Sequence, residues 1–195
     1  MVEVRGSGLE QAGEGLFALQ DLPAHSLVSL FAGVRLSTAR ARQHRSDYRI
    51  RLTADTDLDI PDSCRGLDRY RATLAHKANH SFSPNTVWDL MEHPRFGLIR
   101  ALCSTQDIPA GQEITVNYNL GLAAGPDWYR LLWLRHVRET KHWTEEAVQR
   151  YIERNYDMTM KRIVLPSEDT LVVPEPVGAR EEQEEEEEQE EREEQ

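Results

Sequence analysis

The sequence NHSFSPN at residues 79–85 decides the fold, together with GQEITVNY at residues 111–118. The first stretch is polar and ends in a turn signal at Pro84. The second alternates polar residues with Ile114 and Val116 before it reaches Tyr118, as a half-buried strand does. Shorter motifs surround the two stretches in a fixed order: GEGLF at 13–17, GV at 33–34 and DWY at 127–129. An ordered set of motifs is hard to obtain by chance, so the set carries more information than any of its members.

This ordered set resembles the signature of SET-domain lysine methyltransferases. Two further motifs, HKANHSF at 76–82 and HPRFG at 93–97, resemble those of one branch of this family, the SET7/9-type histone lysine monomethyltransferases. The resemblance covers about the first 135 residues. It implies a mainly β fold, a SET domain of short twisted sheets with a threaded pseudoknot. Such threading is a rare exception to the rule against knotted chains.

The chain of 195 residues is long enough for one domain with appendages. We expect a SET domain over 1–121, a post-SET helix closing the lysine channel over 122–137, a helical or extended extension over 138–179, and a disordered Glu-rich tail over 180–195. With Cys64 and Cys103 as its only cysteines, the chain has neither a disulfide framework nor four thiolates for structural zinc. Many SET proteins close the lysine channel with a cysteine-rich zinc segment, so the helix carrying Trp128 is expected to close it here.

The net charge of -11 is concentrated at the C-terminal end. Residues 180–195 contain eleven Glu and two Arg, which sum to -9 and leave -2 for the other residues. A block of like charges without aromatic residues cannot bury apolar surface, and we expect it to be disordered. Two interpretations stand with equal weight: the tail attracts basic partners such as histones, or it only keeps the protein in solution.

No run approaches the roughly 20 apolar residues that a membrane helix needs, and the N-terminal region lacks the pattern of a signal peptide. We therefore expect an intracellular protein, in the nucleus or the cytoplasm, with no membrane contact. No direct nucleic-acid site is evident in the sequence.

The hydrophobic pattern predicts a domain with many short strands and few helices. A strand, turn and strand are expected at the N-terminus, with GEG at 13–15 on the turn; further strands are expected at 27–31, 58–60, 87–91, 97–103 and 113–118, a turn at 108–111 and a short helix at 68–76. After Pro126 the spacing becomes helical, with Trp128, Leu131, Leu132 and Arg135 on neighbouring turns. Thr144 opens a second helix, whose Val148, Tyr151, Ile152 and Asn155 share a face, and residues 163–173 read as extended.

Methyl transfer from a sulfonium to a lysine amine is an in-line displacement that needs an uncharged amine. With a lysine pKa of about 10.4, neutrality at pH 7 costs about 4.6 kcal/mol. Desolvation in an apolar channel and the nearby sulfonium charge both disfavour the ammonium form. This chemistry requires no metal. The spacing of His76 and His80 would place two ligands on one helix face, but no third ligand follows, so we predict no metal site.

The resemblance assigns roles at the cofactor site. It implies that the backbone of Gly13, Glu14 and Gly15 lies against S-adenosylmethionine, that Asn79 and His80 contact this cofactor, and that Tyr118 is the catalytic residue beside the transferring methyl. Read alone, GEG is more often a plain β-turn and Tyr118 an ordinary residue at a strand end. The ordered motifs favour the functional interpretation.

The resemblance also implies a substrate channel lined by Phe31, Trp88, Leu120 and Trp128. Phe31, Trp88 and Leu120 stand where the monomethylating relatives carry tyrosines, and Leu132 replaces an acidic cofactor contact. Trp128 is expected to pack over the lysine methylenes, and its alternative role is ordinary helix packing. We expect the lost hydroxyls to permit some dimethylation, unless the larger ring of Trp88 fills the vacated space.

Three functions remain open at this point. The leading hypothesis is an S-adenosylmethionine-dependent protein-lysine methyltransferase that acts on a lysine-containing protein such as a histone and regulates chromatin. The first alternative is a catalytically weak SET-like module that binds basic peptides or histones. The second is a β-rich scaffold whose acidic tail recruits partners.

Overall fold

The computed structural model describes residues 2–10, 12–43, 46, 48–61, 73–123 and 125–156. Cys64, most of the helix expected at 68–76, the segment 163–173 and the Glu-rich tail lie outside the described residues. The chain forms two compact units, the first ending at Tyr118 and the second beginning at Asn119. Each unit is described by itself.

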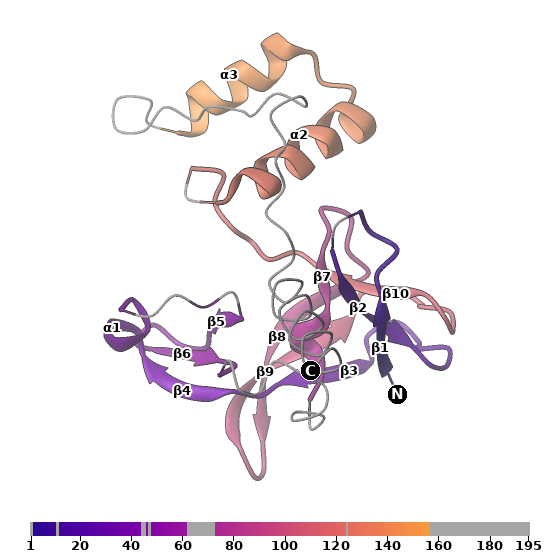
Figure 1. Cartoon of the computed structure of the whole chain (residues 1–195), viewed down its shortest axis with the longest axis vertical. Helices are drawn as coiled ribbons and strands as arrows, with labels where there is room; N and C mark the ends of the chain where they lie inside the picture. Colours follow the sequence, from indigo (N-terminus) through magenta and orange to yellow (C-terminus); the bar gives the residue numbers. More distant parts are fainter. Residues whose placement is uncertain are drawn as a thin grey trace, which may run out of the picture. The chain divides into compact units, whose positions relative to one another are not determined.

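The first unit contains a seven-stranded and a three-stranded sheet (Figure 1). The larger sheet runs in the order β1-β2-β10-β8-β9-β3, and β7 also pairs with β10. Its strands are β1 (Val2–Gly6), β2 (Glu14–Ala18), β3 (Leu27–Phe31), β7 (Asn79–His80), β8 (Thr86–His93), β9 (Gly97–Ser104) and β10 (Glu113–Val116). The smaller sheet has the order β4-β6-β5, from β4 (Val34–Ser37), β6 (Thr56–Asp59) and β5 (Arg49–Arg51), and is joined by the short helix α1 (Thr38–Ala41).

The two sequence stretches that decide the fold are paired strands. β7 and β10 run parallel, with Asn79 opposite Thr115 and His80 opposite Val116. Thr86, at the start of β8, pairs with Val116 in the same direction. The segments at 79–86 and 113–116 are therefore side by side although far apart in sequence.

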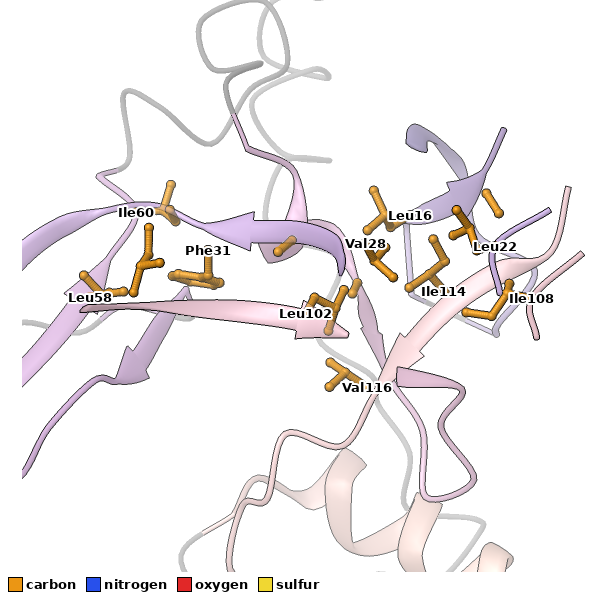
Figure 2. Close-up of a cluster of buried hydrophobic side chains, with 14 of the residues drawn as sticks. Leu16, Leu22, Val28, Phe31, Leu58, Ile60, Leu102, Ile108, Ile114 and Val116 are labelled. Carbon is orange, nitrogen blue, oxygen red and sulfur yellow. The ribbon is translucent and has the colours of Figure 1, made fainter. Parts of the chain in front are cut away.

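One hydrophobic core underlies both sheets of the first unit. Figure 2 shows its largest members gathered between the strands: Leu16, Leu22, Val28, Phe31, Leu58, Ile60, Leu102, Ile108, Ile114 and Val116. On β10 the alternation is strict, because Ile114 and Val116 are buried while Glu113 and Thr115 are half-buried on the other face. One strand thus contributes to the core and to the polar network described below.

The expected mainly β fold of short sheets is confirmed, with local corrections. β3 has the predicted bounds, whereas β10 ends at Val116, so Tyr118 lies two residues beyond the strand. The turn expected at 13–15 ends at Gly13, whose φ is +64°, because Glu14 and Gly15 already pair with Gly6 and Arg5 in the β1–β2 ladder. Ala75–Lys77 forms a 3₁₀ helix.

The second unit is a helical pair, α2 (Asp127–Lys141) and α3 (Glu145–Asn155). Thr144 caps α3 as predicted, because its hydroxyl accepts from the Ala147 amide at 3.3 Å. Trp133, Trp143 and Tyr151 form an aromatic cluster, with ring centroids 5.2 to 6.2 Å apart.

The predicted faces of the two helices need correction. On α2 the buried positions are Leu131, Trp133, Leu134 and Val137, together with Tyr129, whereas Leu132 is 37% exposed. On α3 Val148 and Ile152 are buried as predicted, but Asn155 is exposed. Among the described residues, no helix has the length and apolar character needed to cross a bilayer.

Gly33 connects the two sheets at a point where no side chain fits. A Cβ at this position would lie 2.5 Å from the Asp59 carbonyl oxygen, and a Cβ at Gly6 would meet nothing within 4 Å. We predict that Gly33→Ala lowers the free energy of unfolding by about 1–3 kcal/mol, because the β6 backbone would have to move. Urea titration of both variants measures this, with Gly6→Ala as the matched control. Equal midpoints in Gly33→Ala and the parent protein would contradict the close approach.

Candidate active site

The carboxylate of Glu113, at the start of β10, accepts hydrogen bonds from separate segments. Its Oε1 accepts from the Ser7 hydroxyl at 2.7 Å and from the Asn79 amide at 3.0 Å, and its Oε2 accepts from the Gly8 backbone N–H at 2.9 Å. The Asn79 amide also donates to the Glu14 carbonyl at 2.9 Å. We call Glu113, Ser7, Gly8 and Asn79 the Glu113 clamp. It joins the β1–β2 loop, β2, β7 and β10.

Gly15 lies directly against this clamp. A Cβ at Gly15 would lie 2.3 Å from Glu113 Oε1 and 3.1 Å from Asn79 Nδ2. Any other residue would displace these groups. The sequence predicted a glycine that lets the backbone approach a cofactor, but the close neighbours seen in the structure are Glu113 and Asn79. A cofactor contact by the Gly13–Gly15 backbone stays a prediction.

Asn85 joins the two stretches through the backbone of β10. Its amide donates to the Glu113 carbonyl at 2.8 Å, and its Oδ1 accepts from the Thr115 N–H at 2.8 Å. The Thr86 hydroxyl donates to the Thr115 carbonyl at 2.7 Å. Asn85 and Thr86 are only 4% and 1% exposed, so these bonds are made in a desolvated environment.

Tyr118 is held by hydrogen bonds through both its backbone and its side chain. Its backbone N–H donates to His80 Nδ1 at 3.1 Å, and its hydroxyl donates to the Ala78 carbonyl at 3.0 Å. The Tyr118 and His80 rings are tilted at 51° with centroids 5.3 Å apart. Although the residue is 37% exposed, desolvation of the hydroxyl and then the neighbouring Tyr48 phenol raise the pKa of Tyr118. The phenol is therefore a protonated donor at neutral pH.

His76 and His80 are both buried but lie on different elements, the 3₁₀ helix and β7. Burial lowers the pKa of each imidazole to about 4, and the Lys77 charge adds to the effect at His76. Both rings are consequently neutral at pH 7. In the part of the chain that the structure describes, no three His, Cys, Asp or Glu side chains gather in a way that could hold a metal ion.

Glu14 and Lys77 form an ion pair beside the clamp. Lys77 Nζ lies 2.7 Å from Glu14 Oε2, and the lysine side chain is 9% exposed whereas the glutamate is 51% exposed. The pair leaves an accessible carboxylate near Asn79 and His80.

The predicted channel residues fall in two groups. Phe31 meets Trp88 edge-on, with ring centroids 5.6 Å apart, and Phe31 is 4% exposed within the core. Leu120, which is 38% exposed, and Trp128, which packs edge-on against Tyr129, belong to the second unit. The role of all four in a channel stays a prediction.

Sequence reasoning missed the central place of Glu113 and Asn85 and gave no role to Tyr48. Asn85 is the last residue of the stretch at 79–85, so the sequence did show a polar residue next to an expected strand. Glu113 also stood out as the charged residue that opens an apolar strand. No periodicity could reveal that Glu113 contacts Ser7 and Gly8, which lie more than a hundred residues earlier.

Comparisons with known proteins found similarity over more than half of the chain. The model of the SET-domain family matches residues 13–119. The chain is also similar to histone-lysine N-methyltransferase SETD7 of Halocynthia roretzi, with 35% identity over 141 residues. That similarity covers 67% of this chain and 36% of the relative, so the matched part spans about a third of the relative's length.

Because of the hydrogen bonds in the Glu113 clamp, we predict that a small substitution at Glu113 lowers the stability of the protein. Glu113→Gln replaces one accepting oxygen with a donor that faces other donors, which we expect to lower the free energy of unfolding by about 1–3 kcal/mol. Urea titration measures the change. Glu92→Gln, at an exposed position of β8, is the matched control and should keep the parent midpoint. A Glu113→Gln variant as stable as this control would show that the clamp is dispensable.

The buried histidines predict acid sensitivity. The unfolded chain takes up these protons near pH 6.5, whereas the folded protein takes them up only near pH 4. Stability is therefore complete above pH 6.5 and falls as the pH drops toward 4, by roughly 1 kcal/mol per histidine per pH unit. Urea midpoints between pH 7 and pH 4.5 measure this fall. We expect a shallower fall in His80→Asn, which keeps an acceptor for the Tyr118 amide.

The matched control for this series is His25→Asn. His25 is exposed and has a φ of +62°, a conformation that asparagine tolerates. The control should follow the parent curve. A pH profile that His80→Asn leaves unchanged would assign the acid sensitivity to other groups.

Proposed function

This chain belongs to the SET-domain family, and from that premise we propose that it transfers a methyl group from S-adenosylmethionine to the side-chain amine of a protein lysine. The observation that carries the proposal is the position of Tyr118. Its hydroxyl and the carbonyl of Ala78, the residue before β7, form a pair of oxygens, and its ring lies against His80. Oxygens of this kind make weak but directional C–H···O contacts with a polarised methyl group.

The residues beside Tyr118 are compatible with a cationic cofactor. Because the pKa of His80 is lowered to about 4, no imidazolium opposes a sulfonium at neutral pH. The half-exposed Glu14 carboxylate can bind the ammonium end of an amino acid, and the Gly13–Gly15 backbone offers polar groups nearby. Asn79 uses both amide hydrogens inside the protein, and its side-chain carbonyl oxygen is the acceptor we assign to a ligand. When bound, S-adenosylmethionine supplies an electrophilic methyl carbon on a positively charged sulfur.

The reaction balances without a metal. The lysine amine first loses a proton to solvent, and its lone pair then attacks the methyl carbon as the S–C bond breaks. The bonding electrons remain on sulfur, and the products are S-adenosylhomocysteine and an N-methylated lysine. The role we infer for the protein is to hold the amine in line and desolvated, which offsets the cost of about 4.6 kcal/mol for a neutral amine at pH 7.

We further infer that the substrate is a histone and that the protein works in the nucleus as a chromatin regulator. The support is the similarity to a histone-lysine N-methyltransferase and the sequence of the Glu-rich tail, which suits a basic partner. The alternative is a SET-like module that binds a basic peptide without methylating it. Phe31 and Trp88 favour this alternative, because neither carries a hydroxyl.

Incubation with labelled S-adenosylmethionine and a panel of histones separates these functions. We predict incorporation by the parent protein and a loss of about tenfold or more in turnover for Tyr118→Phe, because the lost hydroxyl acts in the transition state. Cofactor affinity, measured by calorimetry, should stay nearly constant. Tyr151→Phe, which alters a tyrosine of the second unit, is the matched control. Equal turnover in Tyr118→Phe and the parent would remove Tyr118 from catalysis, and peptide binding without incorporation would favour the binding module.

A further inference from the structure

The smaller sheet and α1 carry an excess of arginine. Their described residues within 34–60 include five arginines and three aspartates, and neither lysine nor glutamate. All five arginines are exposed: Arg35, Arg40, Arg42, Arg49 and Arg51. We call this set the arginine surface. Like charges gathered on one surface sum to a field that attracts groups of the opposite sign, so this surface favours an acidic ligand.

The three aspartates of the smaller sheet are already bound by neighbouring side chains. Asp57 is only 4% exposed and forms an ion pair with Arg51. Asp59 accepts a hydrogen bond from the Ser46 hydroxyl. Asp55 accepts from two threonine hydroxyls, which lower the pKa of its carboxyl group. Each carboxylate therefore has partners within the smaller sheet or its loops.

Arg40 and Arg42 present their charges to solvent from a fixed backbone. In the part of the chain that the structure describes, neither guanidinium makes a hydrogen bond or an ion pair. The backbone is held, because the Arg40 N–H donates to the Ser37 hydroxyl at 3.3 Å and the Arg42 N–H donates to the Thr38 carbonyl at 3.1 Å. These two cations are thus placed for a ligand from outside the chain.

Contacts within the first unit connect α1 to the candidate active site. The Arg49 guanidinium donates to the carbonyl of Ala41 in α1. Tyr48, the residue before Arg49, meets His76 edge-on with ring centroids 5.6 Å apart. The sum of these short steps is roughly 25 Å at most, the length of about seven residues of an extended peptide. A peptide whose lysine reaches Tyr118 can therefore also reach α1.

We propose that Arg40 and Arg42 select substrates in which acidic residues flank the target lysine. The inference rests on the proposed function and adds to it the class of protein segment that the site accepts. A guanidinium presents its N–H donors in a planar fork that matches a carboxylate, and hydrogen bonds between charged partners are the stronger ones. Basic flanking residues are repelled by the same two charges. The proposed histone substrate is narrowed accordingly, to a lysine with acidic neighbours.

An acidic peptide suits the arginine surface better than a nucleic acid does. Nucleic-acid affinity comes from neutralising many phosphates, whereas five arginines and three aspartates leave an excess of two positive charges on the smaller sheet and α1. The net charge of -11 for the whole chain also opposes a polyanion. A few carboxylates on a short peptide match two exposed cations.

The binding of three labelled peptides to the full chain tests this preference. The peptides share a central lysine and differ only at the flanking positions, which are all Glu, all Gln or all Arg. With saturating S-adenosylhomocysteine and about 50 mM NaCl, fluorescence anisotropy should show the Glu peptide binding about three- to tenfold more tightly than the Gln peptide, as expected for two exposed charge pairs. The Arg peptide should bind most weakly. The differences should shrink at about 500 mM NaCl, because salt screens exposed charges.

Two double variants assign the preference to its residues. In Arg40→Gln/Arg42→Gln the ratio of the affinities for the Glu and Gln peptides should fall close to one. Arg150→Gln/Arg154→Gln removes two exposed arginines of α3, and it is the matched control because it changes the net charge equally. It should keep the parent ratio and, like the first variant, the parent urea midpoint. An unchanged ratio in Arg40→Gln/Arg42→Gln, or an equal loss in both variants, would overturn the proposal.

Methylation of the same peptides with labelled S-adenosylmethionine separates this inference from the function on which it rests. A higher kcat/KM for the Glu peptide, lost in Arg40→Gln/Arg42→Gln, supports the proposal. If the parent methylates all three peptides with equal kcat/KM, the selection is overturned while methyl transfer stands. If the parent neither methylates a peptide nor binds the cofactor, both are overturned. Tighter binding of a labelled duplex DNA than of the Glu peptide, lost in the same variant, would assign the two arginines to nucleic acid and overturn the proposal.

Discussion

The structure of the first unit depends on one half-buried carboxylate. Glu113 receives hydrogen bonds from Ser7 and Gly8 in the β1–β2 loop and from Asn79 in β7, two segments that are far apart in the sequence. Hydrogen bonds to an ionised acceptor are stronger than neutral ones, and the part-buried bonds from Ser7 and Asn79 would be lost without it. The carboxylate therefore fixes how the N-terminal loop and β7 meet β10. Gly15 completes the arrangement, because only a glycine leaves room for the Glu113 side chain.

The same strand connects this clamp to the core and to the candidate active site. Ile114 and Val116 bury their side chains, which holds β10 in register, while its backbone binds the side chains of Asn85 and Thr86. The chain then leaves the sheet, and Tyr118 is caught by His80 and Ala78 on the neighbouring strand segment. A side chain placed two residues after a strand has the freedom of a loop, but the amide and the hydroxyl of Tyr118 are both bound. The position of Tyr118 is thus a consequence of the β7–β10 pairing.

Much of the fold could be predicted from the sequence, because strands and helices have periodic signals. The bounds of β3, the presence of strands at β8 and β9, and the start of α3 at Thr144 followed from apolar strand patterns, turn residues and capping chemistry. For the site, the sequence predicted which residues belong to it but not which contacts they make. The reason for Gly15 and the partners of Glu113 depend on contacts between segments distant in sequence, which no local pattern encodes. The packing of Tyr48 against His76 likewise required the smaller sheet to be in place.

The substitutions at the expected channel have a common physical reason. Phe31 is 4% exposed and meets Trp88 and His76 edge-on, so it lies in an apolar environment built from rings. A tyrosine there would bury a hydroxyl, and a buried hydroxyl without a partner costs about 1–3 kcal/mol. His76 is neutral in this environment because burial lowers the pKa of its imidazole. Tyr48 is only partly buried at the margin of the same core. Phenylalanine at position 31 therefore leaves the core free of an unsatisfied polar group.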